Sequence, residues 1–480
     1  MTRKSVTILI GLFLLCCNIS AQNKVKYIFY FITDGTGVNT ILGTEMYKAE
    51  KKRAIGREKL CMSQFPVQSI ASTFSADNGV TDSAASGTAL ATGKKTKNGA
   101  IGMLPDLQTP VSSIATWAKA SGMRVGIATS VPINHATPAA FYAHDASRNS
   151  YYKIGSDIAS SDFEFFGGAE IHNHFDPKHN PGKPDLYTEL KKYGYEVAFG
   201  VADYKKKSGK AKKIILVQDT TQLNPASGSF SLPYAIEAKA NELKIEEILD
   251  CQIDFLMKDN KNGFFLMNEI GGKVDFACHA QDAATAFAEV EAVDRCMKIA
   301  YDFYLQHPDE TLIVLTADHE TGGLVLALDH IYGLNLKILE NQKVSMDGFS
   351  AHLRQIAKDN GNTVSWEMAK NAITECFGLW EKIQVTEEEE KGIKEAWESS
   401  FGKNTQMVKN EYSSNPALSD FVKKLMSRKA LVSWSTRGHS GGFVPVYAIG
   451  IGSELFTGYN DNSLIPLKIA KAAGFTIPEN

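Results

Sequence analysis

The chain has 480 residues, of which 44% are hydrophobic and 22% are charged, and its formal net charge is −3. A chain of this length can bury a large hydrophobic core, and its mild acidity gives no indication of a nucleic-acid partner. One large domain with insertions and two or three separate domains agree equally well with this length.

The first 21 residues are typical of an export signal. Two basic residues precede an apolar run over residues 6–17, and Ala21 offers a cleavage position. Because the run is too short to span a bilayer, we expect it to be removed and the protein to be periplasmic or secreted, with no stable membrane insertion. A lipid anchor on Cys16 or Cys17 is the less favoured alternative.

Buried strands alternate with helices along most of the chain. Residues 26–33 form a continuous apolar and aromatic run, as expected for a strand buried in a parallel sheet. Further strands are expected at residues 124–130, 163–166, 214–218, 264–268, 311–316 and 444–451, and helices at residues 110–121, 234–258 and 280–306. This alternation predicts an α/β fold, with three layers (α/β/α) around a central, mostly parallel sheet.

Between residues 339 and 430 the pattern changes to three or four amphipathic helices. Thr386 and Glu389 have the spacing of a capping box, and no catalytic cluster falls in this stretch. We therefore expect a helical insertion that acts as a lid or a partner surface. The expected division is a signal peptide (1–21), the first part of the core (22–338), the insertion (339–430) and the last part of the core (431–480).

A candidate nucleophile, Ser83, lies where a loop turns into a helix rich in small residues. The unpaired N–H groups and the dipole of a helix N-terminus favour an anion such as phosphate. The alternative is that Thr81 or Asp82 is only an N-cap and Ser83 is an ordinary residue of the first turn. The local pattern alone does not distinguish these two interpretations.

Acidic and imidazole side chains recur at predicted strand ends and on one helix face. Asp34 follows the first strand, where open α/β sheets bind ligands. The other candidates are Asp318 and His319 at a later strand end, Asp275 and His279 four residues apart at the start of a helical pattern, and His439 in a glycine-rich loop. Carboxylates and imidazoles together predict a two-metal site and suit zinc.

With these motifs in this order, the sequence resembles the alkaline phosphatases. The matching segments are residues 81–86, residues 136–138 followed by Arg148, and residues 275–279, 317–322 and 438–439. Nearly the whole chain is covered except the helical insertion. The resemblance implies an exported, metal-dependent enzyme that hydrolyses small phosphate monoesters.

The resemblance also implies a role for each matching residue. Ser83 would form a phosphoseryl intermediate, and Arg148 would bind two oxygens of the phosphoryl group with its planar fork. The first of two zinc ions would be held by Asp275, His279 and His439, and the second by Asp34, Asp318, His319 and Ser83. Such a pair can stabilise both the entering and the leaving oxygen of an in-line displacement.

A third site, usually occupied by magnesium in this family, would use Asp34, Thr137 and a glutamate upstream of Asp275. Here the chain departs from the best-known bacterial members: His135 replaces an aspartate, and Phe276 replaces a lysine or histidine. The identity of the third metal, with His135 as one candidate ligand, therefore stays open.

The spacing of Glu269 is a further departure, because it lies six residues before Asp275 where the family has five. A one-residue slip in a strand would turn the carboxylate away from the third site. We expect the chain to bulge at Gly271 and Gly272 and so return the carboxylate. The alternative is that Ile270 takes the place of the glutamate.

Two rival functions remain open. A phosphodiesterase or a sulfatase on the same scaffold is the nearest rival, since a fold does not determine a substrate. Ser83 together with Arg148 and Thr137 favours monoesters. An inactive phosphate-binding homologue would lack a ligand or the nucleophile, and the pattern lacks neither. A homodimer is also an open alternative.

Overall fold

The computed structural model describes residues 25–219, 230–402, 405–409 and 411–478. The predicted export signal lies outside these residues. Within them, no helix has the length and apolar composition that a membrane crossing requires. The thiols of the five cysteines beyond the predicted signal are free, four of them buried.

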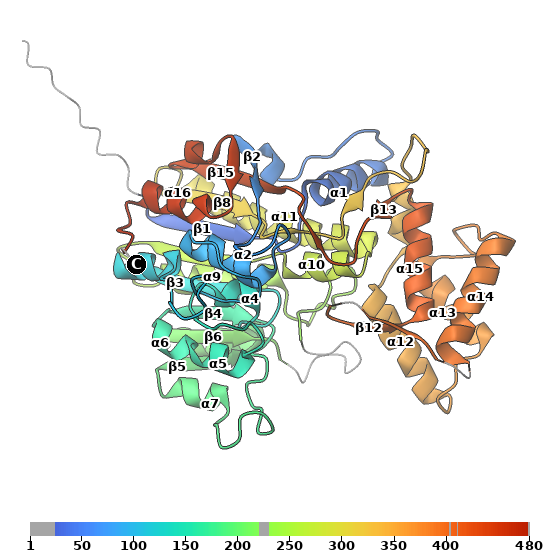
Figure 1. Ribbon diagram of the computed structural model, residues 1–480, viewed down its shortest axis with the longest axis horizontal. Coiled ribbons are helices and arrows are strands. Elements are labelled where there is room, and N and C mark those ends of the chain that lie inside the picture. Colours follow the sequence, from blue (N-terminus) through green and yellow to red (C-terminus); the bar gives the residue numbers. More distant parts are fainter. Residues whose placement is uncertain (1–24, 220–229, 403–404, 410, 479–480) are drawn as a thin grey trace, which may run out of the picture.

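A ten-stranded sheet runs through the described chain in the order β16-β2-β15-β8-β1-β7-β3-β4-β6-β5 (Figure 1). Its strands are β1 (Tyr27–Ile32), β2 (Val67–Ser72), β3 (Arg124–Thr129), β4 (Phe165–Gly168), β5 (Tyr195–Phe199), β6 (Lys213–Val217), β7 (Phe264–Glu269), β8 (Thr311–Thr316), β15 (Val444–Gly450) and β16 (Tyr459–Asp461). Among these, only β15 runs antiparallel to its neighbours. The predicted mostly parallel sheet is confirmed.

Helices cover both faces of this sheet, because alternate side chains of the central strands point to opposite sides. Tyr30 belongs to a buried cluster with residues of α2, α3 and α16, whereas Phe29 belongs to another with residues of α9 and α11. These helices are α2 (Ser83–Thr92), α3 (Ile114–Ala120), α9 (Ile245–Met257), α11 (Ala283–Gln306) and α16 (Leu464–Ala473). Burial of each such aromatic ring contributes roughly 2–3 kcal/mol. The predicted three layers are confirmed.

Further helices connect the strands or lie at their ends. They are α1 (Val38–Lys51), α4 (Ala136–Ala139), α5 (Tyr151–Ser156), α6 (Ile158–Ser161), α7 (Leu186–Lys191), α8 (Gly200–Lys207) and α10 (Gly272–His279). Two of them, α4 and α10, follow the ends of β3 and β7 and lead directly to the candidate site.

Three helix predictions need correction at their first residues. The helix expected at residues 110–121 begins at Ile114, because the side chain of Ser113 accepts a hydrogen bond from Thr116 N. Pro110 instead forms an isolated antiparallel β-bridge with Met103. The Thr109 hydroxyl, just before the predicted start, donates to Asp106 at 2.6 Å and caps no helix.

The other two helices also start later than expected, because polar side chains cap them further along the chain. Residues 234–244 form turns, and α9 begins at Ile245, where the Glu247 carboxylate accepts from Lys244 N at 2.9 Å. The helix expected from residue 280 begins at Ala283, where Asp282 is the cap. The strand expected at residues 163–166 lies at Phe165–Gly168.

Four helices gather at one side of the molecule, drawn in orange in Figure 1, and have a hydrophobic core of their own. They are α12 (Met346–Asp359), α13 (Trp366–Phe377), α14 (Glu387–Phe401) and α15 (Ala417–Lys429). The capping box of Thr386 and Glu389 is present. Phe287 of α11 joins the same core and links it to the main sheet. A hairpin of β11 (Met407–Lys409) and β12 (Ser414–Pro416) lies between α14 and α15.

Candidate metal centre and anion pocket

Three carboxylates meet at one edge of the sheet, because three neighbouring parallel strands end there. Asp34 follows β1, Asp318 follows β8, and Glu269 is the last residue of β7. Since β1 pairs with both β7 and β8, these side chains lie next to one another. Gly35 allows the close approach of Asp275: its φ is +71°, and a Cβ there would come within 2.6 Å of the Asp275 Cα.

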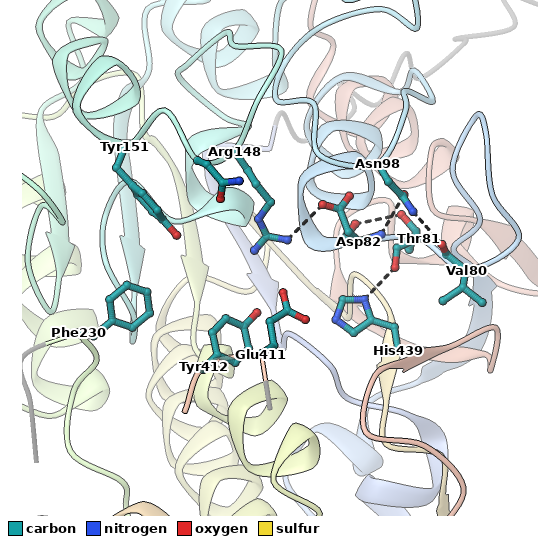
Figure 2. Close-up of a pocket in the computed structure, with 11 residues that line it drawn as sticks. Val80, Thr81, Asp82, Asn98, Arg148, Tyr151, Phe230, Glu411, Tyr412 and His439 are labelled. Atoms are coloured by element: carbon teal, nitrogen blue, oxygen red, sulfur yellow. Dashed lines mark hydrogen bonds and ion pairs between the residues drawn. The ribbon is translucent and has the colours of Figure 1, made fainter. Parts of the chain in front are cut away.

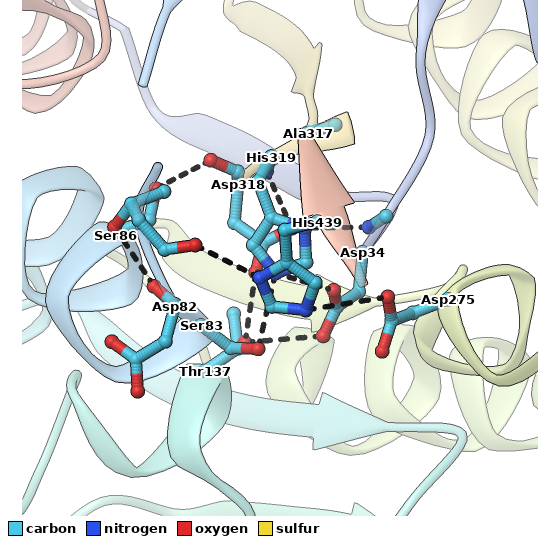
Figure 3. Close-up of polar contacts among 12 residues, drawn as sticks. Asp34, Asp82, Ser83, Ser86, Thr137, Asp275, Ala317, Asp318, His319 and His439 are labelled. Carbon is cyan, nitrogen blue, oxygen red and sulfur yellow. Dashed lines mark hydrogen bonds and ion pairs between the residues drawn. The ribbon is translucent and has the colours of Figure 1, made fainter. Parts of the chain in front are cut away.

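Potential metal ligands form three groups at this edge, and within each group the ligand atoms lie within 4.8 Å of one another. The groups are Asp275, His279 and His439; Asp34, Asp318 and His319; and Asp34, His135 and Glu269. Figure 3 shows Asp275 and His439 of the first group in one polar cluster with the residues of the second group. The Ser83 Oγ lies 3.2 Å from His319 Nε2, and the Thr137 Oγ1 lies 3.4 Å from Asp34 Oδ2. The structure thus assembles all ten predicted metal ligands.

The three histidines of the first two groups are oriented in the same way. His279 Nδ1 donates to the Arg437 carbonyl at 2.6 Å, and His439 Nδ1 donates to the Thr81 carbonyl at 2.8 Å. The Thr321 hydroxyl donates to Asp275, so it can accept only from His319 Nδ1, which lies at 3.2 Å. In the neutral form of each ring, the proton is therefore on Nδ1 and the lone pair on Nε2, which is the tautomer that coordination of a metal through Nε2 requires.

The Nε2 atoms face carboxylates or each other. His279 Nε2 lies 3.2 Å from His439 Nε2 and 3.4 Å from Asp275 Oδ1. His319 Nε2 lies 3.4 Å from Asp34 Oδ1 and 3.2 Å from Asp318 Oδ2. Lone pairs that face one another across such distances repel unless a cation lies between them.

Buried polar atoms without hydrogen bonds also gather here. Among the described residues they include Asp34 Oδ1, His135 Nδ1, Glu269 Oε1 and Asp275 Oδ2. An unsatisfied buried group costs about 1–3 kcal/mol, and more when it is charged. The donor set of carboxylate oxygens and imidazole nitrogens therefore fits metal ions.

The pKa values at the site reflect burial and mutual repulsion. Burial, followed by the neighbouring carboxylates, raises the pKa of Asp34 well above its usual range. Burial also raises the pKa of Glu269 to about 8 and that of Asp318 to about 6. Burial opposes ionisation of Asp275 too, but His279 and the other nearby imidazoles outweigh it and lower its pKa. Without cations the site thus favours partial protonation of its carboxylates.

Glu269 reaches the third group by a route that differs from the predicted bulge. The ladder between β7 and β3 stays regular up to the pair of Thr129 and Glu269, and the Thr129 hydroxyl donates to the Glu269 carboxylate. The extra residue lies in the turn at Ile270 and Gly271, before α10 begins. The predicted bulge is wrong because a turn after the strand accommodates the extra residue without changing the strand register. Ile270 is buried in the hydrophobic core and does not take the place of the glutamate.

Ser83 is the first residue of α2, a helix whose residues are all buried. Asp82 is its N-cap and accepts from Ala85 N at 2.9 Å. The packing of α2 against α4 is close, because Gly87 lies against the Thr137 backbone and a Cβ there would come within 3.1 Å of the Thr137 Cα. The small residues thus bring the Ser83 hydroxyl to the predicted metal ligands, and of the two candidate N-caps, Thr81 and Asp82, it is Asp82 that caps α2.

A cavity of about 630 Å³ opens beside Asp82, the N-cap of α2, and His439 of the first metal group (Figure 2). Arg148 projects into it; its Nη1 lies 3.2 Å from Asp82 Oδ2 and its Nη2 lies 3.3 Å from His135 Nε2. Residues that the sequence did not indicate also line the cavity: Tyr151, Phe230, Glu411 and Tyr412. No spacing in the sequence connects Glu411 or Tyr412 with the distant motifs, so only the folded chain reveals them.

Comparisons with known proteins identify the family of this chain. The family model described as alkaline phosphatase matches residues 25–165 and 209–475. Alkaline phosphatase 3 of Bacillus subtilis (strain 168) is 30% identical over 467 residues, which cover 96% of this chain and 91% of that protein. The cold-active alkaline phosphatase from the psychrophile Shewanella sp. has a TM-score of 0.77 at 26% identity, covering 94% of this chain and all of that one.

A second solved structure agrees in fold. The Thermus thermophilus alkaline phosphatase has a TM-score of 0.75 at 21% identity, and the match covers 94% of this chain and 92% of that one. The family match over most of the sequence, the shared fold and the metal-binding groups at the sheet edge lead to one conclusion: this chain belongs to the alkaline phosphatase family, whose members hydrolyse phosphate monoesters.

Proposed function

We propose that this protein is an exported alkaline phosphatase that forms a phosphoserine at Ser83. The observation that carries the proposal is the common orientation of three imidazoles around one serine hydroxyl. His279, His319 and His439 each bind an acceptor through Nδ1 and direct Nε2 toward a carboxylate, with the Ser83 Oγ 3.2 Å from one of them.

The ligand types support two zinc ions and one further cation. Asp275, His279 and His439 would hold the first zinc ion; Asp34, Asp318, His319 and Ser83 would hold the second. The third cation would be held by Asp34, Thr137, His135 and Glu269. We assign this cation to magnesium, and we expect the site to select magnesium less strictly than a site made of oxygen ligands alone, because the His135 imidazole also suits zinc. The chemistry that bound cations would supply is a lower pKa for a coordinated hydroxyl and stabilisation of the entering and leaving oxygens.

The side chains of the pocket would position the phosphoryl group. Arg148 would bind two of its oxygens, and Asp82 and His135 already direct the guanidinium into the cavity. Ser83, having lost its proton, would attack phosphorus through Oγ while the bond to the ester oxygen breaks and the departing alkoxide gains a proton. Water would then cleave the phosphoserine, releasing phosphate and restoring the hydroxyl.

The division of the chain and its destination belong to the same proposal. Residues 1–21 would be an export signal, residues 339–430 a helical insertion, and residues 22–338 and 431–480 the catalytic core. N-terminal sequencing of the exported protein would test the cleavage after Ala21, and sedimentation analysis would test for a homodimer.

The central test is the variant Ser83→Ala, assayed with metal analysis. We expect hydrolysis of a monoester to fall by roughly a thousandfold or more, with zinc content and fold retained, because the covalent route is lost while the other ligands remain. Ser399→Ala, a partly exposed position on α14 in the helical insertion, is the matched control and should be fully active. Activity of Ser83→Ala within a few-fold of the wild type would contradict the nucleophile assignment.

The same assay should include a phosphodiester and a sulfate ester. The monoester should be the best substrate, since Arg148 and the serine are arranged around a terminal phosphoryl group. A higher kcat/KM for the diester or the sulfate would favour the corresponding rival function on this scaffold.

A further inference from the structure

The hairpin of β11 and β12 carries side chains from the helical insertion into the phosphate cavity. Its strands pair Met407 with Pro416 and Lys409 with Ser414, and residues 411–413 lie at the tip between them. Glu411 Oε2 lies 3.4 Å from His279 Nε2, and the Tyr412 ring centre lies 5.2 Å from that of His279. The insertion therefore lines the pocket directly.

Aromatic rings form one wall of this cavity. The Tyr412 ring is stacked on Phe276, with a centroid separation of 3.9 Å and an interplanar angle of 29°, and Phe276 is in turn stacked on Phe230 at 6.1 Å. Tyr151 lies on the other side of Phe230, with the His172 ring between them at 4.8 and 4.9 Å. Figure 2 shows Tyr151, Phe230 and Tyr412 around the open space below Arg148.

The charges of the cavity are arranged with Arg148 at the centre and carboxylates on two sides. Asp82 is already engaged, because it caps α2 and pairs with Arg148. The Glu411 side chain is 43% exposed and faces the solvent end, next to His279. In the proposed function, Ser83 attacks from the second metal group, so in an in-line displacement the alcohol departs on the side of the first group, which contains His279. Glu411 and the aromatic wall therefore lie where the leaving group would be.

A carboxylate beside several aromatic faces is an environment for an organic cation. Ammonium and trimethylammonium groups bind to such faces through cation–π attraction, which is stronger in a partly desolvated site, and a nearby carboxylate adds Coulomb attraction. A neutral group of the same shape would gain only the hydrophobic contact, and an anionic group would be repelled by Glu411.

We propose, on the basis of the proposed function, that the preferred substrates are phosphate monoesters of amino alcohols, with an ammonium or trimethylammonium group a few bonds from the ester oxygen. Glu411 and the rings of Tyr151, Phe230 and Tyr412 form the subsite for this cation. The hairpin of the helical insertion therefore determines leaving-group specificity.

The test compares three esters on the wild-type enzyme. Phosphocholine carries the cation, 3,3-dimethylbutyl phosphate has the same shape with carbon in place of nitrogen, and phosphoglycolate carries an anion. We expect kcat/KM to be roughly tenfold higher for phosphocholine than for the neutral ester, and lowest for phosphoglycolate.

Glu411→Gln should reduce the preference for phosphocholine to about twofold, because kcat/KM should fall much more for the cationic ester than for the neutral ester. Glu395→Gln on α14, which removes an exposed carboxylate of the same insertion, is the matched control and should keep the wild-type ratio. If Glu411→Gln lowered kcat/KM equally for all three esters, or lowered the zinc content of the protein, the inference would be overturned, because Glu411 would then serve the metal group or the fold.

Binding without turnover provides a second readout. In calorimetry on Ser83→Ala, phosphocholine should bind roughly tenfold more tightly than 3,3-dimethylbutyl phosphate, and the additional variant Tyr412→Leu should remove most of this difference. Equal affinities, or hydrolysis of all three esters by the wild type with equal kcat/KM, would overturn this inference alone. No hydrolysis of any ester by the wild type would overturn the proposed function, and this inference with it.

Discussion

Arg148 is held in place from two sides. One nitrogen of its guanidinium lies 3.2 Å from Asp82 and the other lies 3.3 Å from His135, so its planar fork is fixed before a phosphoryl group arrives. Asp82 is itself fixed, because it caps α2 and accepts from Gly99 N at 3.0 Å. A preorganised fork loses little side-chain entropy on binding, which favours recognition of two oxygens at once.

Arg148→Ala should therefore raise both KM and the inhibition constant of the product phosphate by roughly 10- to 100-fold, the equivalent of a lost charged hydrogen bond. Arg148→Lys keeps the charge without the fork and should recover only part of this loss. Both constants can be measured by steady-state kinetics with added phosphate. Unchanged phosphate inhibition in Arg148→Ala would remove this residue from the pocket.

At the scale of single elements, the start of α11 is coupled to the helical insertion. The buried carboxylate of Asp282 accepts hydrogen bonds from the backbone and hydroxyl of Thr285, from the amide of Gln342 and from Met346 N. One side chain thus caps α11 and anchors the first residue of α12. Removing it would leave several buried donors unsatisfied.

Asp282→Ala should destabilise the protein by about 3 kcal/mol, because the loss of a cap adds to the cost of unsatisfied donors. Thr386→Ala, which removes the exposed cap of α14, is the matched control and should cost about 1 kcal/mol. Chemical denaturation followed by circular dichroism would compare the two. A smaller loss for Asp282→Ala than for Thr386→Ala would contradict the coupling.

The strands that place the site were predictable, whereas several others were not. The strands β1, β7 and β8 are continuously buried, so their apolar runs stand out in the sequence. The strand β2 is half-exposed and polar, and β16 has only three residues, so neither has a recognisable pattern. The route of Glu269 was missed because strand alternation suggested a bulge, whereas a turn after the strand takes up the extra residue.

At the scale of the whole molecule, the order of strands in the sequence was enough to predict that the metal ligands lie at one sheet edge, but not how the helical insertion packs against the core. Parallel strands end at the same edge, so Asp34 and Asp318 were expected to be neighbours. The contact of Glu411 with His279 depends on how four helices pack against the core through residues such as Phe287. Such packing follows from three-dimensional shape, which no motif spacing in this sequence encodes.

The whole-molecule consequence of the buried carboxylates is a stability that depends on pH when metal is removed. Burial raises the pKa of Glu269 from 4.5 to about 8 and raises that of Asp34 well above its usual range. The folded, metal-free protein then binds more protons than the unfolded chain, so its stability decreases as pH rises toward 8. Burial lowers the pKa values of His135 and His319, so these two side chains make the folded protein more stable as pH rises. This opposite effect is confined to pH values around and below 6.5, the ordinary pKa of histidine.

The melting temperature of chelator-treated protein should therefore fall between pH 6.5 and 8, a window in which Glu269 titrates and which lies above the ordinary pKa of His135 and His319. Zinc and magnesium should raise the melting temperature and flatten this dependence, because cations stabilise the ionised carboxylates and bind only the folded chain. Glu269→Gln should make the fall shallower, whereas Glu454→Gln at an exposed position should not. Scanning calorimetry across this window is the measurement, and a melting temperature that rises with pH in the metal-free protein would contradict the expected charge balance.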